Sequence, residues 1–213
     1  MALTKAGAEI DAWAEVAQNA IRNGAEYDAS GLYCATLHVD CCLSSTAAHT
    51  GTLIIVEIRS AASGNGYWHE LRRWIGPTGT AIKVDLAGAQ NAGNTVLGVT
   101  NPVTNNLDVD GKRLFLENTD NVVNSEIVFQ VANSGDDGDT ITIAPGLANN
   151  QSGNSDFYTI DAALTASPNE AVGQYHVALP DECLAVRVRY VNKYDNDGAT
   201  VHTRTRISGT SAV

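Results

Sequence analysis

LAVRVRYVNKYDNDGATVHTRTRI, residues 184–207, places two runs of alternating apolar and polar residues on either side of a polar turn. Successive side chains of a β-strand point to opposite faces, so each run is typical of a strand that buries one face. The turn, residues 193–198, is rich in Asp, Asn and Gly, which tolerate tight or left-handed backbone geometry. The stretch therefore predicts two antiparallel strands that pair as a hairpin.

Paired in this way, the two strands would carry four arginines on one face, with His202 beside them: Arg187, Arg189, Arg204 and Arg206. The whole chain has 13 Lys and Arg against 24 Asp and Glu, a formal net charge of -11, so this face would invert the overall sign. Two interpretations stay open. The arginines pair with the chain's own carboxylates on a solvated face, or they form an interface with an acidic partner, for which the arginine fork is well suited.

The composition is that of a β protein with many loops and a polar, weakly charged surface. Only 17% of the 213 residues are charged, whereas 44% are hydrophobic and 19 are glycine. The acidic balance argues against a nucleic-acid partner, because phosphate contacts require a basic surface. No apolar run approaches the length of a membrane span, and residues 1–10 lack the pattern of a secretion signal. We therefore expect synthesis in the cytoplasm, no membrane partner, and four reduced cysteines: Cys34, Cys41, Cys42 and Cys183.

Residues 4–22 show the spacing of an amphipathic helix, with apolar residues recurring at steps of three and four. The stripe consists of Ala6, Ile10, Trp13, Ala17 and Ile21. Thr4 is a suitable N-cap, and Asn23 followed by Gly24 is a suitable stop. We expect residues 1–29 to form a helical arm. Trp13 then needs a covering surface, either the chain's own β core or a neighbouring subunit, and it is therefore an interface candidate.

From residue 31 onward the apolar period changes to two, and glycine-, asparagine- and aspartate-rich links separate short runs. The expected strands span residues 33–43, 52–59, 67–75, 81–86, 95–100, 113–116, 125–131, 140–144, 157–160 and 175–179, followed by the two terminal runs. This pattern predicts an all-β fold, an antiparallel β-sandwich or jelly roll with one N-terminal amphipathic helix. A single domain over residues 1–213 is the favoured organisation; a division within residues 144–155 is the alternative.

Motifs for chemistry are missing from the sequence, so we expect no catalytic residues, cofactor or metal. There is no phosphate-binding glycine motif and no nucleophile elbow. Cys34 and Cys42 would lie roughly 26 Å apart on one strand, too far to share a zinc ion. The acidic turns at residues 136–139 and 195–198 are fragments of calcium loops that lack the terminal Glu. The carboxylates of Glu57, Glu70 and Asp85 have no spacing that pairs them for glycoside hydrolysis.

Taken together, the helix-first chain, its Gly/Asn/Thr-rich strands and the terminal hairpin of residues 185–207 resemble the accessory virion proteins of tailed bacteriophages, especially head-decoration (cement) proteins. This resemblance implies a homo-oligomer, most often a trimer, that binds the major capsid protein or another virion protein on the outside of the shell. It also implies that the protein resides in the virion. Two alternatives stay open: a receptor- or carbohydrate-binding β module with Trp68 and Trp74 as a stacking platform, and a jelly-roll hydrolase.

Overall fold

The computed structural model describes residues 3–60, 67–79, 81–100, 113–132, 140–160, 171–192 and 199–212. Within them the chain is all-β and every strand pairing is antiparallel, as predicted; the helical structure there is one short 3-10 turn, Val122–Asn124. No helix in these ranges is long and apolar enough to cross a membrane. The acidic turn at 136–139 and the terminal turn at 193–198 lie outside the described residues.

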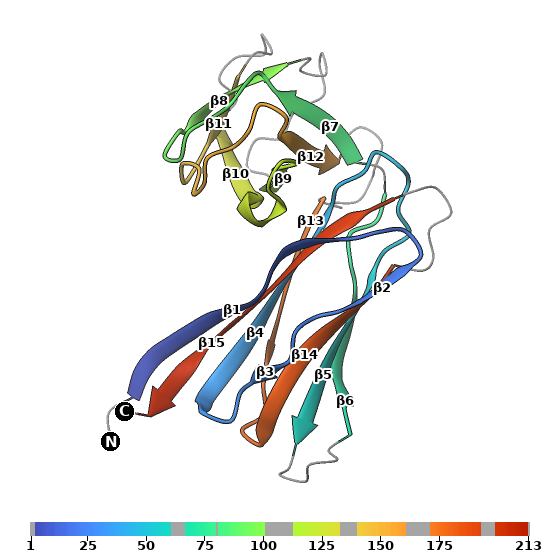
Figure 1. The fold of residues 1–213 in the computed structure, drawn as a ribbon, viewed down its shortest axis with the longest axis vertical. Helices are drawn as coiled ribbons and strands as arrows, with labels where there is room; N and C mark the ends of the chain where they lie inside the picture. The colour runs from blue at the N-terminus through green and yellow to red at the C-terminus, as the bar shows by residue number, and fades with distance from the viewer. Residues whose placement is uncertain are drawn as a thin grey trace.

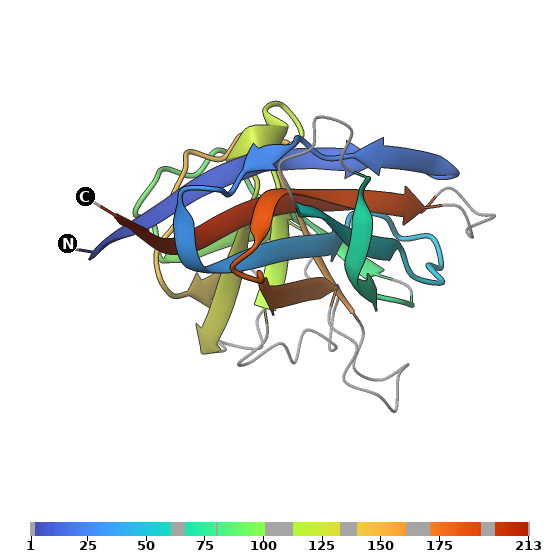
Figure 2. The same cartoon turned by 90° about the horizontal axis from the view of Figure 1, so that it is seen from below.

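Two sheets pack face to face as a β-sandwich (Figure 1). The first has the order β1-β15-β4-β13 and the second β2-β14-β5-β6, with the short β3 also paired to β14. The strands of the first sheet are β1 (Leu3–Val16), β15 (Val201–Ala212), β4 (Leu32–Leu43) and β13 (Val172–Ala178). Those of the second are β2 (Ala20–Asn23), β3 (Tyr27–Asp28), β14 (Cys183–Asn192), β5 (Leu53–Ser60) and β6 (His69–Ile75). The start of β1 and the end of β15 lie side by side (Figure 2).

The alternating pattern of each strand sends apolar residues into the space between the two sheets. Polar contacts also join the two sheets, and in one of them the Tyr190 hydroxyl of β14 and the Thr205 hydroxyl of β15 lie 2.6 Å apart. This contact shows that Thr203, Thr205 and Ile207 face inward on β15, so Arg204 and Arg206 point to the outer face.

A second lobe, a closed six-stranded barrel, is inserted between β6 and β13 (Figure 1). Its strands are β7 (Ala81–Leu86), β8 (Val96–Thr100), β9 (Arg113–Glu117), β10 (Glu126–Ala132), β11 (Thr140–Ile143) and β12 (Asp156–Ile160), in the spatial order β10-β11-β8-β7-β12-β9. The barrel has its own apolar core, which includes Leu97, Leu114, Leu116 and Ile143. Closure leaves no free sheet edge on these strands.

The two lobes share apolar packing at their junction. Trp13 of β1 is 3% exposed, and its ring centroid lies 5.0 Å from that of Phe115 on barrel strand β9. Phe115 and Tyr158 of the barrel belong to the same buried cluster as the sandwich core. The expectation of one domain over residues 1–213 stays a prediction, and this shared core is a reason to expect the two lobes to unfold together.

The prediction of an N-terminal helix is wrong. Residues 4–22 form β1, a turn and β2, because β15 offers β1 a ladder from Leu3↔Ala212 to Val16↔Val201. Two register shifts, between Glu9 and Asp11 and between Asp11 and Ala14, break the strict alternation of the strand. The bulges let Ile10 and Trp13, three residues apart, both pack against buried surface, as they would in a helix. Ala17 and Ile21 of the predicted stripe are exposed.

At Gly24 the fold requires a residue without a side chain. A Cβ there would lie 2.3 Å from Asp11 Oδ2 and 2.9 Å from the Val188 carbonyl oxygen. The position that the sequence marked as a helix stop is therefore a close approach of the chain, just after β2, to the Asp11 side chain and to the backbone of β14.

Replacing Trp13 with alanine should lower the free energy of unfolding by about 3–5 kcal/mol, because it removes the largest side chain at the junction of the lobes. Urea denaturation followed by circular dichroism measures the change. Val123→Ala, at a position 55% exposed, is the matched control and should change stability by less than about 0.5 kcal/mol. A loss of under about 1 kcal/mol for Trp13→Ala would contradict the packing role.

The thiols give a second check on the fold. All four cysteines are free: Cys34 is exposed, and Cys41, Cys42 and Cys183 are buried. Burial raises the pKa of each of the three buried thiols, to about 12 for Cys41. Since the thiolate is the reactive form, one thiol should react rapidly with a thiol reagent in the folded protein and four after denaturation without reductant. Recovery of two or fewer in the denatured protein would mean that disulfides exist.

Candidate functional site

A buried carboxylate, Asp40, lies in the middle of β4 on the outer face of the β1-β15-β4-β13 sheet. Its register partners are Arg204 on β15 and Gln174 on β13, so three neighbouring strands present polar side chains at one level of the sheet. Asp40 is only 2% exposed. A carboxylate removed from water to this extent is tolerated only when hydrogen bonds and opposite charge compensate it.

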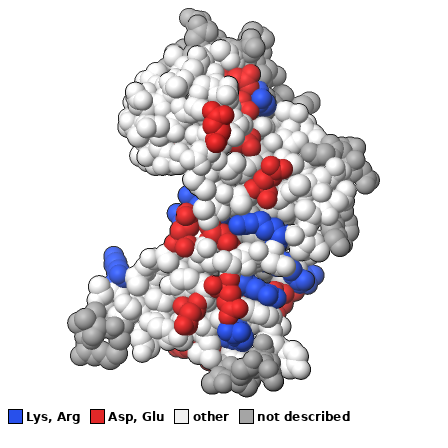
Figure 3. Space-filling model, in the orientation of Figure 1, with Lys and Arg blue, Asp and Glu red and all other residues white. Residues whose placement is uncertain are grey.

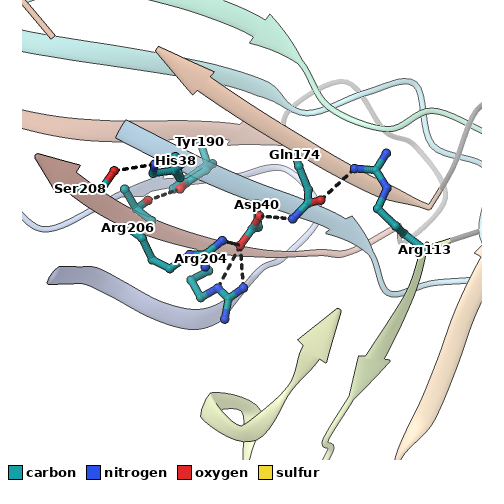
Figure 4. Close-up of polar contacts among 9 residues, drawn as sticks. His38, Asp40, Arg113, Gln174, Tyr190, Arg204, Arg206 and Ser208 are labelled. Atoms are coloured by element: carbon teal, nitrogen blue, oxygen red, sulfur yellow. Dashed lines mark hydrogen bonds and ion pairs between the residues drawn. The ribbon is translucent and has the colours of Figure 1, made fainter. Parts of the chain in front are cut away.

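Arg204, Arg206 and Gln174 supply this compensation (Figure 4). Arg204 donates to Asp40 Oδ2 from Nε at 3.0 Å and from Nη2 at 2.8 Å, and Arg206 Nη2 donates to the same oxygen at 3.0 Å. Gln174 Nε2 donates to Oδ1 at 3.1 Å. Two guanidinium groups therefore share one carboxylate in this Asp40 cluster, and Glu9 of β1 is the register partner of Arg206.

The Asp40 cluster also reaches the barrel. Arg113 of β9 donates from Nη1 to Gln174 Oε1 at 2.9 Å, and the Arg204 guanidinium lies 4.6 Å from the centre of the Trp13 ring. The same residues that satisfy the buried carboxylate thus hold the two lobes to each other.

The second outer face of the sandwich repeats this arrangement around Glu57 of β5. Arg187 Nε donates to Glu57 Oε2 at 2.8 Å, and Arg189 Nη2 lies 3.2 Å from Oε1. Arg187 also lies over the ring of Trp68, 4.3 Å from its centre. In this Glu57 cluster, too, two arginines share one carboxylate that is mostly buried.

The expected hairpin does not form, so the four arginines do not share one face. Their strands are where the sequence predicted them, but β14 pairs with β2, β3 and β5, whereas β15 pairs with β1 and β4. The arginines are thus divided between the outer faces of two opposed sheets, Arg187 and Arg189 on one and Arg204 and Arg206 on the other. Their interface role stays a prediction. Trp13 takes the other placement that the sequence left open, since it packs within its own chain.

An open hollow of about 410 Å³ lies beside the Asp40 cluster, towards the sheet edge. Its polar border consists of Glu9, His38, Arg206 and Ser208. His38 Nε2 and the Ser208 hydroxyl are hydrogen-bonded at 2.9 Å. Partial burial lowers the pKa of His38, and Arg206 and His176 lower it further, so the ring is mostly neutral at pH 7.

A buried titratable pair lies at the junction of the lobes. His202 of β15 is 1% exposed, and its Nε2 lies 3.4 Å from Glu117 Oε1 of β9. Within the described part of the chain, neither of its ring nitrogens has a hydrogen-bond partner. Burial lowers the pKa of His202 to about 4. The pKa of Glu117 is raised to about 6, chiefly by burial and also by Asp156 and Glu15, against the lowering effects of a Tyr158 hydrogen bond and of Lys83.

Glu117 is part of a row of carboxylates that the sequence did not predict, because it depends on which barrel strands are neighbours. Asp156 on β12 is the register partner of both Asp85 on β7 and Glu117 on β9. Lys83 Nζ lies 3.2 Å from Asp85 and 3.0 Å from Asp156. Among the residues that the structure describes, no three His, Cys, Asp or Glu side chains are placed to hold a metal ion.

The remaining candidates from the sequence have partners within the chain. Glu57 binds two arginines, and Glu70 pairs with Arg73. Trp74 stacks on Tyr175 with ring centroids 5.3 Å apart. Arg187 lies over Trp68, so each tryptophan has one ring face in contact with a neighbouring side chain. The sugar-binding alternative stays a prediction.

Comparison with known proteins finds no matching family model and no matching curated protein. Among solved structures, the chain aligns with the infectious bursal disease virus VP2 subviral particle at 5% identity and a TM-score of 0.23, over 99% of this chain and 42% of that chain. It aligns with the T13 viral particle of the same virus at 9% identity and a TM-score of 0.25, over 99% of this chain and 40% of that chain. The chain thus spans about two fifths of these proteins, and likeness at such TM-scores carries no argument about fold or function.

The pH dependence of stability should reveal the buried pair. The pKa of His202 is lowered from 6.5 to about 4, so its stabilising contribution is present above pH 6.5 and is lost as the pH falls towards 4. The pKa of Glu117 is raised from 4.5 to about 6, so its contribution is present below pH 4.5 and is lost as the pH rises through 6. The two contributions oppose each other in the parent protein.

Glu117→Gln should therefore lose stability more steeply than the parent between pH 6.5 and 4, and His202→Gln should instead gain stability relative to the parent as the pH falls. Urea midpoints measured across this range test both variants. The neighbouring groups Glu15, Lys83, Asp85 and Asp156 are common to all three proteins, so the comparison removes the part of their titration that does not depend on Glu117. Parallel pH profiles for the two variants would show that the pair does not titrate in this way.

Proposed function

We propose that this protein is a non-enzymatic structural protein of a virus particle, a head-decoration (cement) protein that binds the outside of a bacteriophage capsid shell and stabilises it. Its partner in this proposal is the major capsid protein or another virion protein, and its location is the virion. The proposal draws on the resemblance of the sequence to phage accessory proteins and on one feature of the surface, the two arginine clusters.

The surface feature that carries the proposal is the two-to-one ratio of arginine to carboxylate in both clusters. The Arg206 side chain is 43% exposed and that of Arg189 is 38% exposed, so each cluster offers one accessible guanidinium. On the face seen in Figure 3, most basic side chains lie beside acidic ones. A partner carboxylate would complete the charge balance of either cluster, and arginine binds carboxylates in a defined, two-pronged geometry.

The placement of the clusters also suits a decoration protein. The outer faces of the two sheets of a sandwich point away from each other, so the Asp40 cluster and the Glu57 cluster can contact two different neighbours at once. A protein that stabilises a shell must bridge neighbouring subunits, and two opposed polar faces provide two points of attachment. A trimeric arrangement on the shell is part of the proposal.

Arg189→Ser and Arg206→Ser should each weaken binding to capsids about tenfold, because each removes the accessible guanidinium of one cluster. Co-sedimentation with capsids of the encoding virus that lack the protein measures the affinity. Arg73→Ser is the matched control, since Arg73 is an exposed arginine paired one to one with Glu70. Binding of the parent should weaken as salt rises, because exposed charge pairs are screened over about 10 Å at 0.1 M salt.

The outcomes separate the parts of the proposal. If the protein does not sediment with capsids at any salt concentration, the decoration role is wrong. If it binds and all three variants bind equally, the role stands and the arginine clusters are only surface. Hydrolysis of a polysaccharide or ester substrate by the purified protein would contradict the non-enzymatic assignment.

A further inference from the structure

The first half of β1 is a free sheet edge. On one side, residues 3–9 pair with β15, from Leu3↔Ala212 to Glu9↔Arg206. On the other side, no strand among the described residues pairs with them, and β1 forms the outer border of the sandwich in Figure 1. Further along the strand, Asp11 contacts Arg22 of β2 and accepts a hydrogen bond from the Ala25 amide, so the free edge ends there.

An unpaired edge of this length presents a row of amide and carbonyl groups that can template another strand. Proteins usually block such edges with bulges, prolines or charged side chains, especially lysine. Both bulges of β1 lie beyond Glu9 in the direction of the barrel, and residues 3–9 contain no proline. Lys5 and Glu9 are the charged residues of this segment, and they carry opposite signs.

We propose that two copies of this chain associate through this edge, with the β1 strands antiparallel and centred on Gly7. In that register Lys5 of each copy lies opposite Glu9 of the other, and Ala6 lies opposite Ala8. Opposed residues of an antiparallel pair share a face, so both Lys–Glu pairs form on the outer face of the joined sheet. The contact is the same surface patch on both copies, as a two-fold interface requires.

The charges select this register over its neighbours. Centring the pairing on Ala6 would place Lys5 opposite Gly7, and centring it on Ala8 would place Glu9 opposite Gly7, so each shift loses both charge pairs. The side chain missing at Gly7 also contributes to the open hollow between Glu9, Arg206 and Ser208. A lysine side chain from the second copy, opposite Glu9, would lie at the border of this hollow.

The joined sheet would run β13-β4-β15-β1 in one copy and continue through β1-β15-β4-β13 in the other, and it would place both Asp40 clusters on one continuous face. A two-fold edge contact is complete after two copies. It therefore produces a dimer, and a trimer on a shell would use a different contact. The inference rests on the edge and its charges and does not depend on the proposed capsid role.

Sedimentation velocity of the full chain over a range of concentrations tests the proposal. The parent should show a monomer–dimer equilibrium. Lys5→Glu and Glu9→Lys should each weaken dimerisation roughly tenfold, because each places like charges opposite one another twice. The double variant Lys5→Glu with Glu9→Lys should restore dimerisation to within about threefold of the parent, since it exchanges the two partners of each pair.

Glu182→Lys, at an exposed position outside the edge, is the control for a change of net charge and should dimerise like the parent. Circular dichroism of each variant confirms the fold. Hydrogen exchange of peptides covering residues 3–9 should slow as the parent dimerises. A parent that is monomeric at every concentration overturns the proposal, and so does a dimer that neither single variant weakens or whose β1 amides stay unprotected.

Discussion

The burial of one carboxylate, Asp40, constrains much of this structure. A charge that is 2% exposed must be matched by donors close at hand, and here they come from both neighbouring strands, with Arg204 and Arg206 on β15 and Gln174 on β13. Each of these partners has a second contact: Arg204 lies over Trp13, and Gln174 accepts from Arg113 of the barrel. A slip of β15 by one residue would turn its arginines into the core, so the carboxylate fixes the register as well as the lobe junction.

Much of the strand pattern could be predicted from the sequence, because alternation and turn residues are local signals. The run at 81–86 coincides with β7, and the run at 33–43 with β4 to within a residue. The N-terminal segment could not, since β1 is held by a partner strand that is nearly 200 residues away and its two bulges imitate helical spacing. The barrel could not be predicted either. The alternation along a strand shows that one of its faces is buried, but it does not show which sheet that face packs against.

The candidate site was predictable in its residues and not in its geometry. The alternation predicted that Arg187, Arg189, Arg204 and Arg206 share one polar face; they do point outward, but the single shared face is wrong. Their grouping follows instead from where Glu57 and Asp40 lie, on two strands distant in sequence that belong to different sheets. The Glu117–His202 pair gave no sequence signal at all, because it exists only where the barrel meets the sandwich.

The distribution of apolar surface limits the kind of contact that this protein can make. The sandwich core, the barrel core and the junction between the lobes enclose the large apolar side chains Trp13, Phe115 and Tyr190. The charged groups on the outer sheet faces are guanidinium groups and carboxylates, and Tyr33, Tyr67 and Ile75 of the sandwich are exposed as well. Contacts of this kind favour specificity and rapid association more than high affinity. Tight attachment to a large assembly would therefore depend on several weak contacts made at the same time. The two opposed arginine clusters, together with the proposed pairing of two β1 edges, would provide such multivalency.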